Sequence, residues 1–137
     1  MTTTPQSPVA KRGDVLLVLF PNSDLRTAKT RPAVVVQADD LQTGLAQIIV
    51  AMITSKMFRA SHPSRVRVLV SSPEGRQSGL LTDSVVMADN LATVTEVAID
   101  RIIGSLPTAD IDAALAHTLG LRTTPAPTQQ PAPAPAD

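Results

Sequence analysis

The chain has 137 residues, with no cysteine, tryptophan or tyrosine, and its twelve Lys/Arg balance its twelve Asp/Glu. This length suits one domain with a modest core, and the absence of cysteine excludes disulfides, thiolate metal sites and cysteine nucleophiles. No apolar run approaches the length of a membrane span and the first residues lack a signal-peptide pattern, so we expect a cytoplasmic protein.

The charges are distributed unevenly along the chain. Residues 11–67 hold nine Lys/Arg against four Asp, a balance of +5, whereas residues 68–137 hold three Arg against eight acids, a balance of −5. A basic half in a neutral protein indicates a surface for a polyanion. The same pattern also fits lysines and arginines that keep the strand edges of a β protein soluble.

Composition divides the chain into three parts. Residues 1–10 form a polar, proline-bearing tail, residues 11–122 carry the apolar patterns of a folded domain, and residues 123–137 form a Pro/Ala-rich tail. Such a tail favours polyproline II and buries too little apolar area to offset the entropy of ordering. We therefore expect one domain between two disordered tails.

Short apolar runs, two of them rich in β-branched residues, predict strands in the first half of the domain. The expected strands are residues 15–20, 32–38 and 46–53, and polar loops are expected at 21–30 and 54–64.

Further short strands and one helix are predicted in the second half. Strands are expected at 65–70, within 80–89 and at 101–106, with a turn region at 75–79 and a helical turn at 96–100. Thr108 and Gly120 bound an amphipathic helix. This order of elements indicates a mainly β domain with a small, strongly bent sheet or partial barrel, closed by a C-terminal helix.

A cation and a hydroxyl flank two of these strands. Arg31 precedes Pro32 at the start of one run, and Thr54 follows the other. Proline suits the first residue of a strand because it has no N–H, and it biases Arg31 to an extended conformation. If the two strands are antiparallel neighbours, Arg31 and Thr54 lie at the same edge of the sheet and can bind a phosphate together. The alternative is a solvated arginine and an ordinary strand end.

Several ordered blocks resemble the MazF/PemK family of toxin endoribonucleases. They are Arg12-Gly13-Asp14-Val15, Phe20-Pro21 with Asp24-Leu25, Arg31-Pro32-Ala33-Val34-Val35-Val36, Ile49-Val50-Ala51-Met52-Ile53-Thr54-Ser55, Asp83-Ser84-Val85-Val86, residues 91–94 and Arg101-Ile102-Ile103-Gly104-Ser105-Leu106. Each block alone is weak, but their order and spacing over residues 11–121 are specific.

The resemblance implies an SH3-like small barrel, MazF/CcdB-like, with a C-terminal α-helix, working as a homodimer. It implies the toxin of a type II toxin–antitoxin system, which cleaves single-stranded RNA without a metal or other cofactor. In the family the RNA 2′-hydroxyl attacks the phosphorus, leaving 2′,3′-cyclic phosphate and 5′-hydroxyl ends. The catalytic arginine and threonine of the family motifs correspond to Arg31 and Thr54. The implied partner is a cognate antitoxin with an acidic disordered tail.

The position of the family's acidic residue, a candidate general base, differs in this chain. Many members carry an acidic residue five positions before the arginine, where this chain has Arg26. Asp24 is the nearest carboxylate and is our candidate base, although an aspartate at the start of a loop also forms turns. His62 is an alternative acid–base group, or an ordinary loop residue.

Basic and aromatic side chains in the two loops are candidate RNA contacts. They are Arg26, Lys29, Ser55, Lys56, Phe58, Arg59 and His62. Phe58 can stack on a base, or it can fold back onto the barrel as part of the core.

Two other functions remain open from the sequence. One is a gyrase poison resembling CcdB, which acts through a C-terminal tryptophan that this chain lacks. The other is a non-catalytic SH3-like binding module. No histidine or carboxylate spacing predicts a metal site.

Overall fold

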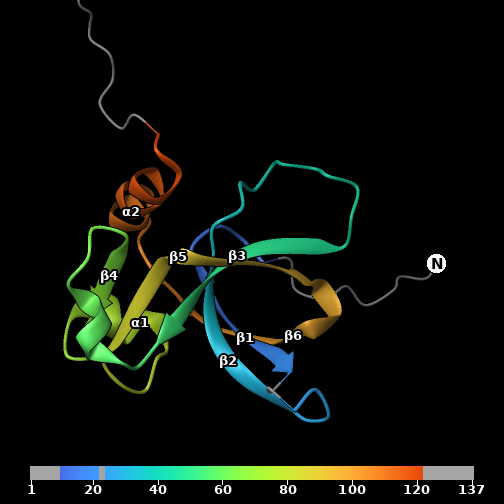
Figure 1. The fold of residues 1–137 in the computed structure, drawn as a ribbon, viewed down its shortest axis with the longest axis horizontal. Coiled ribbons are helices and arrows are strands. Elements are labelled where there is room, and N and C mark those ends of the chain that lie inside the picture. The colour runs from blue at the N-terminus through green and yellow to red at the C-terminus, as the bar shows by residue number, and fades with distance from the viewer. Residues whose placement is uncertain (1–9, 22–23, 122–137) are drawn as a thin grey trace, which may run out of the picture.

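Six antiparallel strands form one sheet in the order β4-β5-β3-β2-β1-β6 (Figure 1). The computed structural model describes residues 10–21 and 24–121. The strands are β1 (Asp14–Pro21), β2 (Ala28–Val35), β3 (Gln47–Thr54), β4 (Arg65–Val68), β5 (Ser84–Thr95) and β6 (Ile99–Ser105). The helical elements are η1 (Met57–Ala60), α1 (Pro73–Ser78), η2 (Glu96–Ala98) and α2 (Ala109–Leu119).

The prediction of a mainly β domain with a C-terminal helix is confirmed. Within the described residues the sheet does not close, because β4 and β6 remain its two edges. It is therefore an open version of the expected small barrel. None of the described helices is long and apolar enough to cross a membrane. The expected tails lie outside the described residues apart from Ala10, so the domain boundaries stay a prediction.

Both faces of the sheet bury apolar side chains. The helix-side cluster contains Val15, Val34, Ala51, Ile53, Val68, Val86, Leu106 and Ile111, the last of which comes from α2. The strand-side cluster contains Leu16, Val18, Ala33, Val35, Ile48, Val50 and Val94. Neighbouring residues such as Val34 and Val35 point to opposite faces and join different clusters, as the period of a strand requires.

Several strand boundaries differ from the sequence prediction. The strand expected at 32–38 begins at Ala28 and ends at Val35, because β1 pairs with β2 from Val15↔Val34 to Pro21↔Ala28. Arg31 therefore lies inside the strand, opposite Val18, and Pro32 is not its first residue.

Later elements also differ. β5 continues to Thr95 instead of ending near residue 89, because its second half pairs with the first half of β3. The prediction of a turn region at 75–79 was wrong, because most of helix α1 lies there. Ser72 Oγ caps this helix by accepting a hydrogen bond from Gly75 N at 3.0 Å, Pro73 occupies its first turn, and Gly79 ends it at φ 75°.

Gly75 gives a test of this packing. Helix propensity alone favours alanine there, but an added Cβ would overlap the backbone carbonyl of Leu69. We therefore expect Gly75→Ala to destabilise the protein by about 1–3 kcal/mol, measured by urea unfolding. Glu74→Ala, at an exposed position of the same helix, is the control and should change stability by less than about 0.5 kcal/mol. A stabilised Gly75→Ala protein would contradict the close approach of α1 and residue 69.

Candidate functional site

β2 and β3 pair over a short stretch and then separate. The ladder joins Ala33 to Met52 and Val35 to Val50, with Val34 opposite Ala51. Beyond Ala33, toward the start of β2 and the end of β3, the described residues show no further pairing. Figure 1 shows these two strand ends running apart. We call this gap in the sheet the β2–β3 opening.

Arg31 and Thr54 flank the β2–β3 opening. Continuing the register by two residues beyond Ala33↔Met52 sets Arg31 opposite Thr54. Both side chains lie on the face of the strand-side cluster. Residues two apart in a strand share a face, so Arg31 shares that of Ala33 and Thr54 shares that of Met52. Arg31 is exposed and Thr54 is half-buried. The predicted pairing of these two strands is confirmed, and it directs both side chains to one face.

Pro32 fits beside this opening. Over residues 28–32, β2 pairs with β1 and not with β3 among the described residues, so its second edge carries no ladder. A residue without an N–H is tolerated at such an edge. The proline therefore suits the separation of β2 from β3, rather than the start of a strand.

A further arginine lies in the same row of the sheet. Thr54 is opposite Val85 of β5, and Val85 is opposite Arg67 of β4. Arg67 is exposed and lies on the same face as Thr54. Arg67 is not among the site residues predicted from the sequence, although the alternation of residues 65–68 indicates a strand with one solvent-exposed face.

The hydroxyl of Thr54 organises the turn that follows β3. Its Oγ1 accepts a hydrogen bond from the backbone N–H of Lys56 at 3.2 Å. Ser55 and Lys56 are exposed, and η1 begins directly after them. The hydroxyl proton of Thr54 is not used in this contact and can be donated to a ligand.

Phe58 and Arg59 form a stacked pair on η1. The Arg59 guanidinium lies 5.7 Å from the centre of the Phe58 ring, and Phe58 is 80% exposed. Arg59 Nη1 also contacts Met87 Sδ at 3.7 Å. The alternative in which Phe58 folds back as part of the core is therefore wrong.

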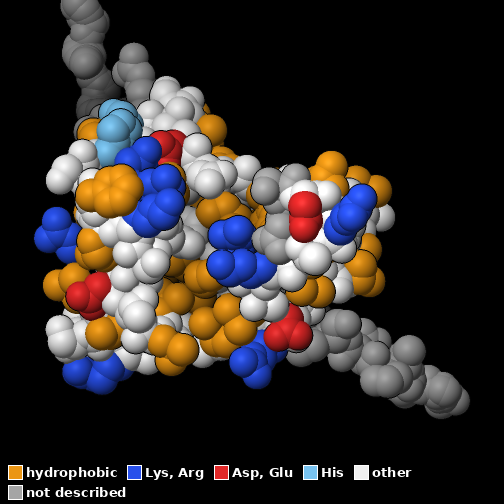
Figure 2. Space-filling model, turned by 60° about the horizontal axis from the view of Figure 1, so that its bottom comes forward, with side chains coloured by type: hydrophobic (Ala, Val, Ile, Leu, Met, Phe, Trp, Pro, Cys, Tyr) orange, Lys and Arg blue, Asp and Glu red, His pale blue; other side chains and the backbone are white. Residues whose placement is uncertain are grey.

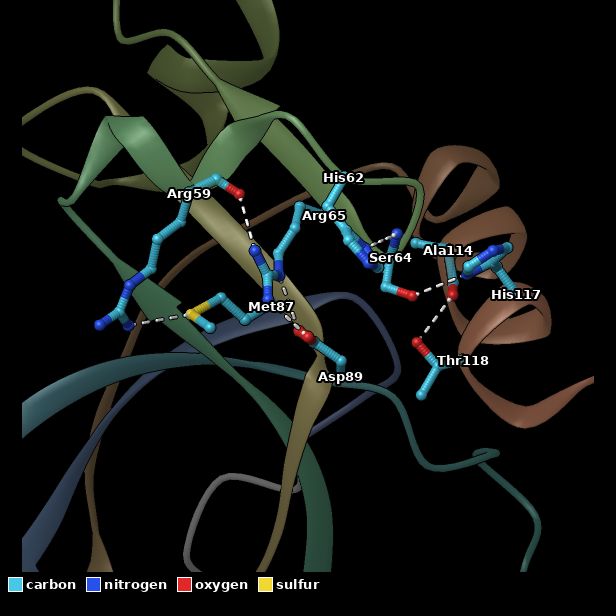
Figure 3. Close-up of polar contacts among 9 residues, drawn as sticks. All are labelled: Arg59, His62, Ser64, Arg65, Met87, Asp89, Ala114, His117 and Thr118. Atoms are coloured by element: carbon cyan, nitrogen blue, oxygen red, sulfur yellow. Dashed lines mark hydrogen bonds and ion pairs between the residues drawn. The ribbon is translucent and has the colours of Figure 1, made fainter.

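An ion pair between β4 and β5 lies beside η1 (Figure 3). Arg65 donates from Nε and Nη2 to the two carboxylate oxygens of Asp89 at 2.9 and 2.6 Å. The Arg65 guanidinium holds the pKa of Asp89 below its usual range, and Asp89 raises the pKa of Arg65. A carboxyl with a lowered pKa keeps its contribution at neutral pH and loses it only as the pH falls through that pKa. This pair was not predicted from the sequence.

His62 lies on the side of the fold that contacts α2. Its Nδ1 accepts a hydrogen bond from Ser64 N at 3.0 Å, and the buried Ser64 Oγ lies 3.0 Å from His117 Nδ1. The two imidazole rings meet edge to face with centroids 5.8 Å apart. Figure 3 shows this group between the β4 segment and helix α2. These contacts connect the loop before β4 to the closing helix.

The candidate base Asp24 lies at the tip of the β1–β2 hairpin. Its Oδ1 accepts backbone hydrogen bonds from Arg26 N at 2.9 Å and Thr27 N at 3.1 Å. These contacts, that of Arg26 first, lower the pKa of the Asp24 carboxyl. Arg26 itself is exposed, as is Lys29, which shares the face of Arg31 two residues along β2. This arrangement favours the turn-forming interpretation of Asp24, because a lower pKa makes a weaker base.

Basic side chains lie in several groups across the face drawn in Figure 2, with apolar and neutral atoms between them. Within residues 10–21 and 24–121, no group of three or more histidines and acids could hold a metal ion.

Comparison with known proteins identifies the family. Residues 11–118 match the model of the family described as PemK-like, MazF-like toxin of type II toxin–antitoxin system. The chain belongs to this toxin family. The resemblance inferred from the sequence blocks is thereby confirmed.

Solved structures share the fold. A chain described as an endoribonuclease from Mycobacterial species is 26% identical, with a TM-score of 0.60 over 87% of this chain and 96% of that chain. An endoribonuclease in complex with its cognate antitoxin, also from Mycobacterial species, is 26% identical, with a TM-score of 0.61 over 83% and 98%. A chain of a MazE–MazF crystal structure from Deinococcus radiodurans has a TM-score of 0.63 at 17% identity, over 83% and 99%.

Proposed function

We propose that this toxin is an endoribonuclease that cleaves single-stranded RNA at the β2–β3 opening. The observation that carries the proposal is the common face and register of Arg31 and Thr54 on either side of that opening. The endoribonucleases among the similar structures support the same activity. The proposed reaction is attack of the RNA 2′-hydroxyl on the adjacent phosphorus. The 5′-oxygen leaves, and the products carry 2′,3′-cyclic phosphate and 5′-hydroxyl ends.

Arg31 would stabilise the charge that develops at phosphorus. In the transition state, negative charge accumulates on the non-bridging oxygens, and a planar guanidinium can donate two hydrogen bonds to them. A preorganised donor of this kind contributes about 3–4 kcal/mol to transition-state stabilisation. Arg31 lies within β2, opposite the buried Val18, and this pairing limits backbone motion that would misplace the guanidinium.

Thr54 would hold the same phosphate from the other side of the opening. Its oxygen already accepts the Lys56 N–H, so its proton can be directed to a phosphate oxygen or to the leaving 5′-oxygen. The ordinary pKa of an aliphatic hydroxyl is far too high for it to act as a base. The backbone hydrogen bonds that lower the pKa of Asp24 make that carboxylate a weaker base as well, and they account for its place in the turn.

The substrate strand would follow the basic side chains around the opening. Arg26 and Lys29 border it on the β1–β2 hairpin, and Ser55, Lys56, Phe58 and Arg59 border it after β3. Phe58 and Arg59 offer a ring face and a guanidinium plane, on which an unpaired base can stack. Arg67 extends the same row, while His62 lies on the side facing α2.

We propose the cytoplasm as the site of action, a homodimer as the working form, and a cognate antitoxin with an acidic disordered tail as the inhibitor. The cognate antitoxin in a similar structure supports the last assignment. An acidic-apolar segment would lie over the connection between β1 and β2 and the connection between β3 and β4, and would fold as it binds.

The first test is cleavage in EDTA. Purified protein should cut unstructured RNA there and leave cyclic phosphate and 5′-hydroxyl ends, because the attacking group belongs to the substrate. End-group analysis of the products is the measurement. Strict dependence on a divalent ion, or 5′-phosphate products, would exclude this mechanism. No cleavage at all would favour a non-catalytic binding module.

The second test concerns Arg31. Arg31→Ala should lower kcat about 10²–10³-fold without loss of fold, because one preorganised donor is removed. Arg31→Lys should recover little, because an ammonium cannot reproduce the planar fork. Arg101→Ala is the matched control, since Arg101 is exposed and pairs with Leu17, a residue of the other face. Wild-type cleavage by Arg31→Ala would show that the site is assigned wrongly.

Thr54 is tested by a second pair of variants. Thr54→Ala should be severely impaired and Thr54→Ser much less so, because serine keeps the hydroxyl. Equal rates for the two variants would remove the hydroxyl from the mechanism.

The third test asks whether RNA and antitoxin share one face. Replacing Lys29, Lys56 and Arg59 together by Glu should weaken both RNA cleavage and antitoxin capture, because charge steers both ligands. Association rates at two salt concentrations are the measurement. The same replacement of Lys11, Arg76 and Arg101 changes net charge equally and should affect neither. Impaired cleavage with unchanged antitoxin affinity would mean that inhibition works elsewhere.

A further inference from the structure

The turn η1 carries two of the proposed RNA contacts but has little stabilisation of its own. None of its residues is buried, and Lys56 before it makes no side-chain capping hydrogen bond. Arg59 N–H donates to the Lys56 carbonyl at 3.0 Å, which closes one turn. A single short turn of this kind is marginal in water without tertiary contacts. Its position therefore depends on groups outside it.

Arg65 supplies such a contact. Its Nη1 donates to the backbone carbonyl of Arg59 at 3.0 Å, while Nε and Nη2 are held by Asp89 (Figure 3). The side chains of Arg65 and Asp89 are only 19% and 30% exposed. A guanidinium fixed at two of its nitrogens presents the third in one direction, because the group is planar and rigid.

A register shift in the pairing of β3 with β5 brings Asp89 to Arg65. β3 pairs Ala51 with Leu91 but Met52 with Met87, so residues 88–90 of β5 lie between two registers. The residue just before β4 anchors this bulge, because Ala88 N donates to Ser64 O at 2.9 Å. Bulges redirect side chains, and here the carboxylate of Asp89 is directed toward β4.

Arg59 is held at both of its ends by this arrangement. Its carbonyl accepts from Arg65, and its guanidinium contacts Met87, the residue that pairs with Arg65 across the ladder. Between these contacts the guanidinium lies over the exposed Phe58 ring. The stacked pair is thus preorganised, which reduces the entropy lost when a base binds.

We propose that Arg65 and Asp89 are positioning residues, which hold η1 so that Phe58 and Arg59 meet the RNA base beside the cleaved phosphate. This inference rests on the proposed function and deepens it, because it assigns base recognition to a turn held by a β4–β5 ion pair. Arg31 and Thr54, on β2 and β3, supply the chemistry at phosphorus separately.

The proposal separates substrate binding from the chemical step. In Asp89→Ala, KM for an RNA oligonucleotide should rise about tenfold, the effect of losing one charge-assisted hydrogen bond, and the preference among cleavage sequences should weaken. With a dinucleotide, which presents the phosphate and little else, kcat should stay within about twofold of wild type. Arg65→Lys should behave like Asp89→Ala, because a lysine cannot bridge the carboxylate and the carbonyl together.

The pair Arg12–Asp112 provides a matched control. Arg12 Nη2 lies 2.6 Å from Asp112 Oδ1, and its Nε donates to the Val36 carbonyl at 3.0 Å. As in the Arg65–Asp89 pair, an arginine is held by a carboxylate and donates to a backbone carbonyl, but this pair does not contact η1. Asp112→Ala should leave KM and sequence preference unchanged. Asp89→Asn keeps the size of the side chain and should show a weaker form of the Asp89→Ala effect if alanine disturbs the fold.

A readout without cleavage completes the test. Amide hydrogen exchange at residues 57–60 of the full chain should be faster in Asp89→Ala and Asp89→Asn than in wild type, and unchanged in Asp112→Ala. Wild-type exchange, KM and sequence preference in both Asp89 variants would overturn the proposal. If the wild-type protein cuts no RNA, the proposed function fails, and exchange alone decides whether the ion pair positions the turn.

Discussion

The early end of the β2–β3 ladder is the constraint on which the rest of the site depends. Up to Ala33 and Met52 the two strands share hydrogen bonds, and beyond them β2 pairs with β1 and β3 pairs with β5. Backbone groups that face the resulting gap must find partners in water or in a ligand. A separation of two central strands therefore creates an open, polar place within an otherwise continuous sheet.

The burial of β2 and β3 on both faces also explains why polar side chains concentrate at that place. Successive residues of β2 and β3 enter the helix-side and the strand-side clusters in turn, so both faces of the strands are apolar through the core. Strands buried on both faces appear in the sequence as unbroken apolar runs rather than as alternation. Polar residues are then tolerated where the strands leave the core, and Arg31 and Thr54 occupy these two positions. The buried neighbours fix their backbones.

Much of the fold, and the pairing at the opening, was predictable from the sequence. Unbroken apolar runs identified β1, β2 and β3, and Thr108 and Gly120 correctly bounded α2. Helix α1 was missed although Ser72, Pro73 and Gly79 carry its start and stop signals, because the six-residue segment between them shows no helical periodicity. Local signals of this kind are readable in principle.

The contacts around η1 were not predictable in the same way. Arg65 and Asp89 are 24 residues apart in the chain, and their pairing requires the register shift in β5 that no single-sequence pattern reveals. The exposure of Phe58 depends on the same arrangement, since an aromatic residue in a loop packs inward or outward according to its tertiary neighbours. Long-range register, rather than local propensity, decided these features.

The electrostatic balance of the ion pair suits a surface that must accept an anion. An unpaired carboxylate at residue 89 would repel the phosphates of a bound strand, and a lone arginine at residue 65 would be free to turn toward them. Paired, the two charges cancel, and the fork of Arg65 fixes the turn without changing the net potential. Positive potential is then left to Arg31, Lys56 and Arg67, whose side chains are exposed. Rigidity and charge are thus supplied by different residues. On this basis, substitutions within η1 can change which base is recognised while the phosphate-binding groups of β2 and β3 stay in place.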